Sequence, residues 1–450
     1  MIASMMAAWR RTPYSSRVKA GLVALLLLAL SLSMGQVERI NNGDGWRTLR
    51  SAQVASDHGY AAFAPFPRYF TFRPSAEIGM VDLIPMSSTG ALVQTWAGVQ
   101  RALGAEQFDF RWLSLTYLAL YLGGILLIML ELHWAAGTAL LLLLLNPYIL
   151  AYFNSAYEES LVIALAPLLV YCALRDGTAV RRGSRALALL ITASKVQFLP
   201  MMLSGLRRAR WQHNAGFLLL ALLLGGGIAV KGSKFSIPNG YNRYFNGLAY
   251  SMAGVSSWPA RDFSGRAALA ASRIDPATVH FPAGSEDARP YWGSSYWPTG
   301  AALAQPQQDL LGTHLRAWFW STLLANPQYA YRIVSEPITT AAGADYRMDY
   351  LFRSTLPAPL LAPYGVLMRY WGALALLAST LSLLAALRAR QVRYALYSLF
   401  LLGYPWLVVY GDGYFEFEKH LFPITLLGVL FPLARLLMRR PPTPAVAPAR

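Results

Sequence analysis

The sequence of 450 residues is poor in charge and almost free of cysteine. Only 14% of its residues are charged, too few to cover the surface of a soluble domain of this length. The single cysteine, Cys172, lies in an apolar stretch, which excludes an intrachain disulfide, a thiolate metal cluster and CxxC chemistry. Any folded loop must therefore be held together by packing alone.

Several catalytic and transport signatures are also missing from the sequence. It contains no P-loop, no GxGxxG between a strand and a helix, no GxSxG and no HExxH. These absences leave ATP-driven transport, nucleotide-sugar chemistry on a Rossmann fold and zinc proteolysis without support. No internal repeat is visible, which counts against most secondary transporter folds.

What the sequence has is apolar residues in blocks. It is 55% hydrophobic, and stretches such as Leu22–Leu32, Leu140–Leu145 and Phe217–Leu224 are nearly pure hydrocarbon. A spanning helix needs about 20 apolar residues to cross a hydrocarbon core of about 30 Å. The sequence therefore predicts an all-α polytopic membrane protein with about eight transmembrane helices, a re-entrant helix pair and two large outer loops.

The net charge of +17 is concentrated beside the apolar blocks. Five short runs hold most of the surplus, and Asp176 and Glu131 are the only acids that we place on the same side. By the positive-inside rule this face is cytoplasmic, so the charge indicates topology rather than a nucleic-acid partner. The runs contain Arg10, Arg11, Arg17 and Lys19; Arg175, Arg181, Arg182 and Arg185; Arg207, Arg208 and Arg210; Arg388, Arg390 and Arg393; Arg435, Arg439, Arg440 and Arg450.

This pattern predicts a multi-pass protein of the cell's inner (plasma) membrane with both termini in the cytoplasm. The first span could also be a signal peptide, but Ser31–Gly35 is a poor cleavage site and favours an uncleaved anchor. The predicted spans are about 18–34, 113–131, 134–152, 160–174, 215–230, 366–386, 394–410 and 420–437. The predicted segments are 1–34 (cytoplasmic start and first span), 35–112 (first outer loop), 113–230 (membrane bundle), 231–363 (second outer loop), 364–438 (last three spans) and 439–450 (cytoplasmic tail).

The segment 186–206 is long enough to cross the membrane, yet both of its flanks are basic and Lys195 lies at its centre. If it crossed, the arginines of 207–210 would lie outside and the charge rule would fail. Two short halves, broken near Ser194–Gln197 and again at Pro200, fit a re-entrant pair better than one span.

Three acidic clusters are predicted at the outer ends of spans. In the first, Asp44 stands between two glycines that allow a tight turn, which makes it a catalytic candidate or an Asx turn. Asp57 is a secondary candidate in the same loop. In the second, Glu158 and Glu159 repel each other unless a cation or proton compensates, although acids also favour a helix N-terminus.

The third cluster lies in the last outer hairpin, where Asp412 and Glu416 precede Lys419 and His420. The lysine and the histidine could hold a donor phosphate, or the group could be ordinary interfacial snorkelling beside an aromatic belt. In the second outer loop, the Trp292 and Trp297 rings suit sugar stacking, although interfacial tryptophans are common.

This arrangement resembles the glycosyltransferase C superfamily, whose members use polyprenyl-phosphate-linked sugars, and in particular bacterial hexose transferases that decorate cell-surface glycans. The motifs that carry the resemblance are Asn41-Asn42-Gly43-Asp44, Tyr152-Phe-Asn-Ser-Ala-Tyr-Glu158-Glu159, Ala193-Ser-Lys195-Val-Gln197 and Gly411-Asp412-Gly-Tyr-Phe-Glu416 with Lys419-His420. The chain lacks the large soluble C-terminal domain of oligosaccharyltransferase-like members, which makes peptide acceptors doubtful.

The resemblance implies that Asp44 acts as a base or metal ligand, and that Glu158 and Glu159 help to hold a divalent cation such as Mg²⁺ or Mn²⁺. It implies a polyprenyl-phosphate-linked sugar as donor, a glycan or lipid as acceptor, and contact with membrane lipids. Transfer of the sugar needs only a base for the acceptor hydroxyl and charge neutralisation on the departing phosphate. The rival functions are a lipid-linked glycan polymerase or ligase, and a lipid or solute transporter or flippase.

Overall fold

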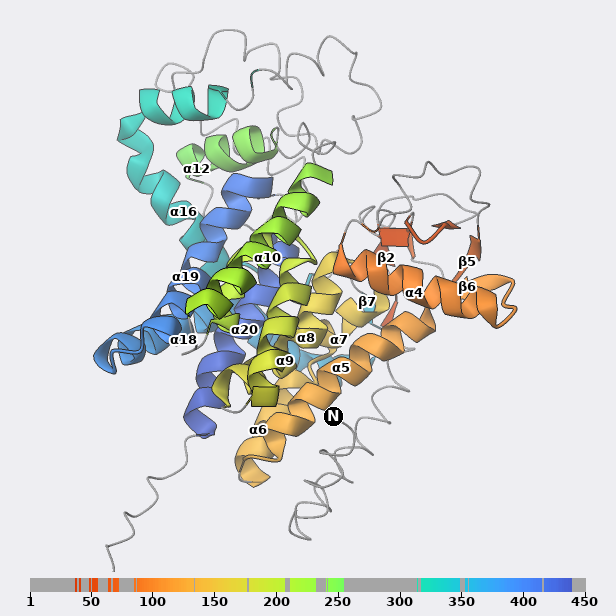
Figure 1. Cartoon of the computed structure of the whole chain (residues 1–450). Coiled ribbons are helices and arrows are strands. Elements are labelled where there is room, and N and C mark those ends of the chain that lie inside the picture. The colour runs from red at the N-terminus through yellow and green to blue at the C-terminus, as the bar shows by residue number, and fades with distance from the viewer. Residues whose placement is uncertain are drawn as a thin grey trace, which may run out of the picture.

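The computed structural model is mostly helical, and its helices gather into a bundle (Figure 1). The all-α membrane class predicted from the sequence is therefore confirmed. The structure describes residues 37–38, 40–41, 48–49, 51–55, 64–65, 68–72, 85, 87–132, 134–175, 178–206, 211–231, 240, 242–254, 314, 317–348, 353–354, 356–414 and 417–438.

The bundle is built from two runs of helices. The first run contains α5 (Arg111–Met129), α6 (Trp134–Leu144), α7 (Pro147–Leu150), the 3₁₀ helix η4 (Ala151–Asn154), α8 (Glu158–Leu174), α9 (Thr178–Thr192), the 3₁₀ helix η5 (Val196–Gly205) and α10 (Trp211–Lys231). The second run contains the π-helix η7 (Tyr244–Ala249), α12 (Tyr250–Ala253), the 3₁₀ helix η9 (Pro327–Tyr329), α16 (Ala330–Gly343), α17 (Ala358–Arg369), α18 (Trp371–Arg388), α19 (Val392–Asp412) and α20 (Phe417–Leu437).

Among the described residues, α5, α18, α19 and α20 are each long and apolar enough to cross a membrane. The helices α6 and α7–η4 form a fifth candidate, bent by 51°. The bend is encoded locally: Asn146 accepts a hydrogen bond from the backbone N–H of Tyr148, and Pro147 opens the new helix. The protein is therefore a multi-pass membrane protein.

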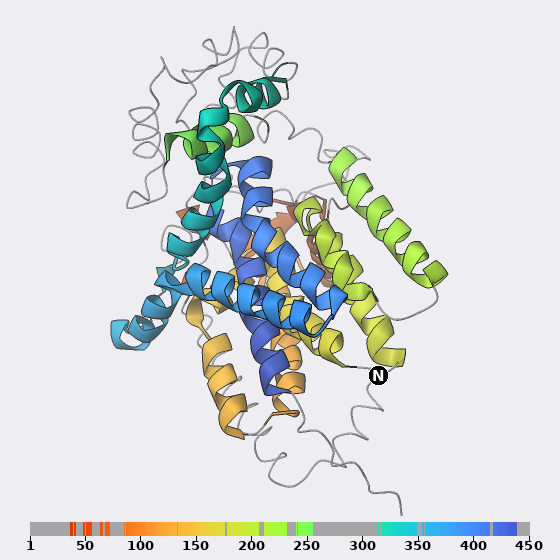
Figure 2. The ribbon, with the colours of Figure 1, turned by 90° about the vertical axis from the view of Figure 1, so that its left-hand side faces the viewer.

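Helix α8 lies at the centre of the bundle, where it packs against α5, α9 and α20. Its residues from Glu159 to Pro167 are buried without interruption, as expected of an apolar helix enclosed on all sides. The close approach of α5 depends on Gly124, because a Cβ there would overlap the backbone of Leu168. Figure 2 shows α10 at the edge of the bundle, where its leucines are exposed.

The segment around Lys195 reverses direction. Helix α9 ends at Thr192, Lys195 is extended (φ −153°, ψ 141°), and η5 then packs against α9. We call α9 and η5 together the hairpin. Arg185 of α9 donates to the carbonyl of Gly205 at 3.3 Å and to Oδ1 of Asn214 at 2.7 Å. The two ends of the hairpin therefore lie together, which is the backbone path that the predicted re-entrant pair requires.

The basic loops gather at this same end of the bundle. Arg393 donates to the carbonyl of Ala173 at 3.2 Å and to that of Leu206 at 3.5 Å. Arg175 forms an ion pair with Glu131 after α5. Basic residues from distant parts of the sequence thus share one face, as the charge pattern predicted.

Short strands and the helix α4 (Ser88–Ala102) cover the opposite end of α5 (Figure 1). The strands pair antiparallel. They form three small sheets: β1 (Val37–Glu38) with β7 (Arg353–Ser354), β2 (Ile40–Asn41) with β4 (Ala64–Pro65), and β3 (Val54–Ala55) with β5 (Tyr69–Phe72) and β6 (Gln107–Asp109).

Candidate functional site

Three ionisable side chains from distant segments meet at the end of the bundle opposite the basic loops. Oε1 of Glu159 lies 2.8 Å from Nδ1 of His420 and 3.3 Å from Nζ of Lys195. The same Lys195 nitrogen lies 3.1 Å from Nδ1 of His420. We call Glu159, Lys195 and His420 the charged cluster.

Glu159 reaches this position because it lies in the first turn of the central helix α8. An acid is stabilised there by the positive end of the helix dipole. The preference of acids for a helix N-terminus therefore also accounts for the Glu158–Glu159 pair. The same central position leaves Glu159 only 3% exposed. A buried carboxylate is costly unless it is paired and hydrogen-bonded, and Lys195 and His420 meet that need.

Lys195 is placed by hydrogen bonds around the tip of the hairpin. The Ser194 hydroxyl donates to the carbonyl of Glu158 at 2.7 Å, and the Thr89 hydroxyl donates to the same carbonyl at 3.3 Å. The backbone N–H of Ser88 donates to the carbonyl of Ala193 at 2.8 Å. The first turns of α4 and α8 therefore fix the hairpin tip, and with it the lysine.

Lys419 lies beside the charged cluster and is fully buried. Its Nζ lies 4.8 Å from the centre of the Tyr157 ring, a cation–π contact, and its charge also acts on Glu159. The hydroxyl of Tyr152 donates to the carbonyl of Lys419 at 3.4 Å, and the Tyr152 ring stacks on Phe422 at 5.1 Å. Aromatic rings thus hold the first turn of α20 against the segment before α8.

Of the other predicted site residues, the structure describes some and leaves the rest outside the described residues. Asp412 ends α19, and Glu158 is half-buried at the start of α8. Thr48, four residues after Asp44, lies against the segment just before α8, because its hydroxyl donates to the carbonyl of Ala156 at 2.8 Å. The candidates outside the described residues are Asp44, Asp57, Glu416, Trp292 and Trp297.

The geometry at Glu159 does not fit a divalent cation. Its carboxylate already contacts the ammonium group of Lys195, whose charge would repel a metal ion at the same position. Glu158 and Glu159 are consecutive helical residues, so their side chains diverge by about 100°. In the part of the chain that the structure describes, no three His, Cys, Asp or Glu side chains gather to hold a metal.

The sequence identified each member of the charged cluster but not their pairing. Glu159 and Lys195 lie 36 positions apart, and His420 follows 225 positions after Lys195. The sequence does not single out the hydroxyl groups of Thr89 and Ser194, which fix the hairpin tip, or that of Thr48, which contacts the segment before α8. Isolated serines and threonines carry no signal in one sequence, since most of them are ordinary surface residues.

Residues 17–234 match the family model described as the YfdI N-terminal transmembrane domain. YfdI is a glycosyltransferase-like membrane protein family. The matched region contains Glu159 and Lys195, whereas His420 lies beyond it. No curated protein and no solved structure matches the chain. The family match and the apolar helices together support a glycosyltransferase-like membrane protein.

Proposed function

We propose that the protein transfers a hexose from a polyprenyl-phosphate donor to a cell-surface glycan or lipid-linked acceptor on the outer face of the inner (plasma) membrane. The observation that carries this proposal is the charged cluster. Cationic and histidine side chains converge at the end of the bundle opposite the basic loops, where a lipid-linked phosphate would enter. The similarity to the YfdI transmembrane domain supports the same reaction class.

The proposed topology has eight crossings. Residues 18–34, α8 and α10 add three to the four long helices and the bent pair, and 186–206 is re-entrant. Both termini are then cytoplasmic, and the positive-inside rule puts the charged cluster at the outer surface.

The proposed role of the cluster is to stabilise the departing phosphate. Lys195 supplies a positive charge, and Lys195 and His420 supply hydrogen-bond donors to phosphate oxygens. Lys419, buried behind Tyr157, contributes through its charge. Glu159 orients Lys195 and His420, because its carboxylate contacts both. These side chains neutralise the charge of the departing phosphate, a role that a divalent cation would otherwise fill.

Asp44 is the proposed general base. Thr48, four residues further on, is hydrogen-bonded next to the start of α8, and four residues of chain span at most about 14 Å. Asp44 would take the proton of the acceptor hydroxyl while the acceptor oxygen attacks the anomeric carbon opposite the phosphate. The bond between the anomeric carbon and the phosphate oxygen then breaks, so the configuration at carbon inverts and polyprenyl phosphate leaves.

The test uses purified protein in lipid nanodiscs with polyprenyl-phosphate hexoses, and follows release of polyprenyl phosphate. Asp44→Asn is expected to remain folded and to lower turnover by at least about 100-fold, the usual contribution of a positioned base. Asp176→Asn, on the predicted cytoplasmic side, is the matched control and should retain turnover.

Full turnover by Asp44→Asn would remove the role of that residue. Movement of the intact donor across the bilayer without release of polyprenyl phosphate would replace the transferase with a flippase. Mild effects of neutral substitutions at Asp44, Glu158 and Glu159 together would favour a polymerase or ligase.

A further inference from the structure

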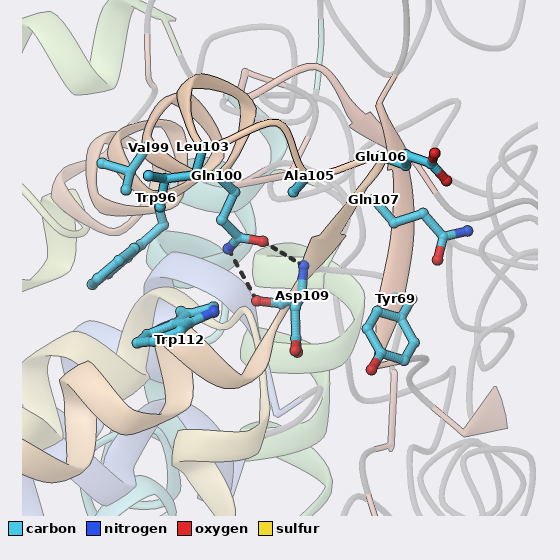
Figure 3. Close-up of a pocket in the computed structure, with 10 residues that line it drawn as sticks. All are labelled: Tyr69, Trp96, Val99, Gln100, Leu103, Ala105, Glu106, Gln107, Asp109 and Trp112. Carbon is cyan, nitrogen blue, oxygen red and sulfur yellow. Dashed lines mark hydrogen bonds between the residues drawn. The ribbon is translucent and has the colours of Figure 1, made fainter.

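A second site lies at the far end of α4, away from the charged cluster. Here α4, β6 and the first turn of α5 enclose a pocket of about 490 Å³, within the usual range for small-molecule sites (Figure 3). Its lining is mixed, with two tryptophans, a tyrosine, two acids and two glutamines. The lining residues are Tyr69, Trp96, Val99, Gln100, Leu103, Ala105, Glu106, Gln107, Asp109 and Trp112.

One side of the pocket is a rigid aromatic surface. The Trp96 and Trp112 rings stack with centroids 5.6 Å apart and an interplanar angle of 23°. Trp96 is fixed by a 2.9 Å hydrogen bond from its indole N–H to the Thr116 hydroxyl. Trp112 is 49% exposed, so one of its faces remains open to a ligand. Such a surface suits the apolar face of a pyranose ring.

The other side of the pocket carries polar groups. Figure 3 shows the indoles on one side of Asp109, and Tyr69, Glu106 and Gln107 on the other. Gln107 and Glu106 are exposed, and an amide beside a carboxylate offers the donors and acceptors that sugar hydroxyls use.

The shape of this polar side is fixed by backbone contacts. The Gln100 side chain accepts a 2.7 Å hydrogen bond from the N–H of Asp109 and donates to its carbonyl at 3.1 Å. Arg111 binds the Asp109 carboxylate through Nε at 2.8 Å. The pocket is therefore preformed, which lowers the entropic cost of binding.

The pocket and the charged cluster are joined by α4. Ser88 and Thr89, at the start of this helix, contact the hairpin tip and the carbonyl of Glu158. Trp96 follows Thr89 by seven residues, or about 10 Å along the helix axis. Because Trp112 opens the candidate span α5, the pocket also lies where a lipid-linked glycan leaves the hydrocarbon.

We propose that this pocket binds a pyranose ring by stacking on Trp112 and by hydrogen bonds to Gln107 and Glu106. Its role as the acceptor subsite rests on the proposed transferase function, whereas sugar binding itself does not. The sugar next to the reacting one occupies the pocket, so the pocket selects the acceptor glycan. The polar side favours a sugar over an acyl chain, which would leave the acids facing hydrocarbon.

The experiment measures binding without a donor. Full-length protein in nanodiscs is titrated with methyl glycosides of glucose, galactose, mannose, rhamnose and N-acetylglucosamine, and saturation-transfer NMR detects protons of the bound ring. Trp112→Ala is expected to weaken binding about 10-fold, the scale of one lost aromatic stack together with its buried area. Trp320→Ala is the matched control, since Trp320 is 56% exposed and does not line the pocket.

Binding that Trp112→Ala and Gln107→Ala weaken, and Trp320→Ala leaves intact, supports the proposal. Absence of binding by all five glycosides, or equal binding by the two tryptophan variants, overturns it. If Trp112→Ala binds sugar as well as the original protein but lies less deeply in the bilayer, Trp112 is a membrane anchor and the proposal is overturned. The binding titration contains no donor, so it is independent of the release assay. If the protein binds sugar here but releases no polyprenyl phosphate in that assay, the proposed function is rejected and the sugar-binding pocket stands.

Discussion

Replacing Lys195 with methionine tests whether the charged cluster does chemistry or only holds the fold. The side chains of Lys195 and Glu159 are 13% and 4% exposed, so Lys195→Met leaves a buried carboxylate without its ammonium partner. Breaking such a pair costs about 3–5 kcal/mol of folding free energy. Because His420 still contacts the carboxylate at 2.8 Å, we expect a loss near the lower end, about 3 kcal/mol.

The double variant Glu159→Gln with Lys195→Met separates stability from activity. It removes both charges together, so its folding free energy should return to within about 1 kcal/mol of the original, since replacing a whole buried pair is often close to neutral. Release of polyprenyl phosphate should stay abolished, because Lys195 no longer neutralises the departing group. Detergent-titrated unfolding followed by tryptophan fluorescence gives the stability, and the nanodisc assay gives the activity.

Two results would refute this reasoning. Recovery of both stability and turnover in the double variant would make the charged cluster purely structural. A Lys195→Met protein as stable as the original would show that Lys195 and Glu159 do not pair in the folded state.

Three further predictions concern packing, loop attachment and cofactors. Gly372→Ala should prevent folding, because its Cβ would overlap the carbonyl oxygen of Ala341, whereas Gly403→Ala meets nothing within 4 Å and should express normally; yield of monodisperse protein is the measurement. Thr48→Val removes the 2.8 Å hydrogen bond to the carbonyl of Ala156, so it should lower the unfolding free energy by about 1 kcal/mol and also lower turnover. Unchanged turnover would show that the segment around Thr48 takes no part in the reaction. Addition of EDTA should leave the release of polyprenyl phosphate unchanged, since lysine and histidine neutralise the phosphate, and a loss restored by Mg²⁺ or Mn²⁺ would reverse that assignment.

The membrane elements could be predicted because hydrophobic length and charge act over short stretches of sequence. The predicted spans 113–131, 394–410 and 420–437 fall on α5, α19 and α20. The sequence predicts one span over 134–152, whereas the structure has a bend after Leu144. Its signal, Asn146-Pro147, is present in the sequence, but a proline kink in a membrane helix resembles a proline that opens a new helix.

The site was less predictable than the spans because it depends on tertiary contacts. Lys195 could be singled out, since a lysine amid apolar residues demands a partner, but nothing in the sequence says that the partner is Glu159. The pocket beside Trp112 was not foreseen, and sugar stacking was instead expected at Trp292 and Trp297. The strands β5 and β6 that line it are four and three residues long, which is too short for an alternating pattern to be read.

The chain order of the charged cluster has a consequence for biosynthesis. Glu159 and Lys195 are separated by 36 positions and can meet as soon as the hairpin follows α8 out of the translocon. His420 belongs to α20, so it is made only after more than two hundred further residues. The nascent protein therefore holds the Glu159–Lys195 ion pair without His420 until α20 inserts, and the charged cluster is completed only at that stage.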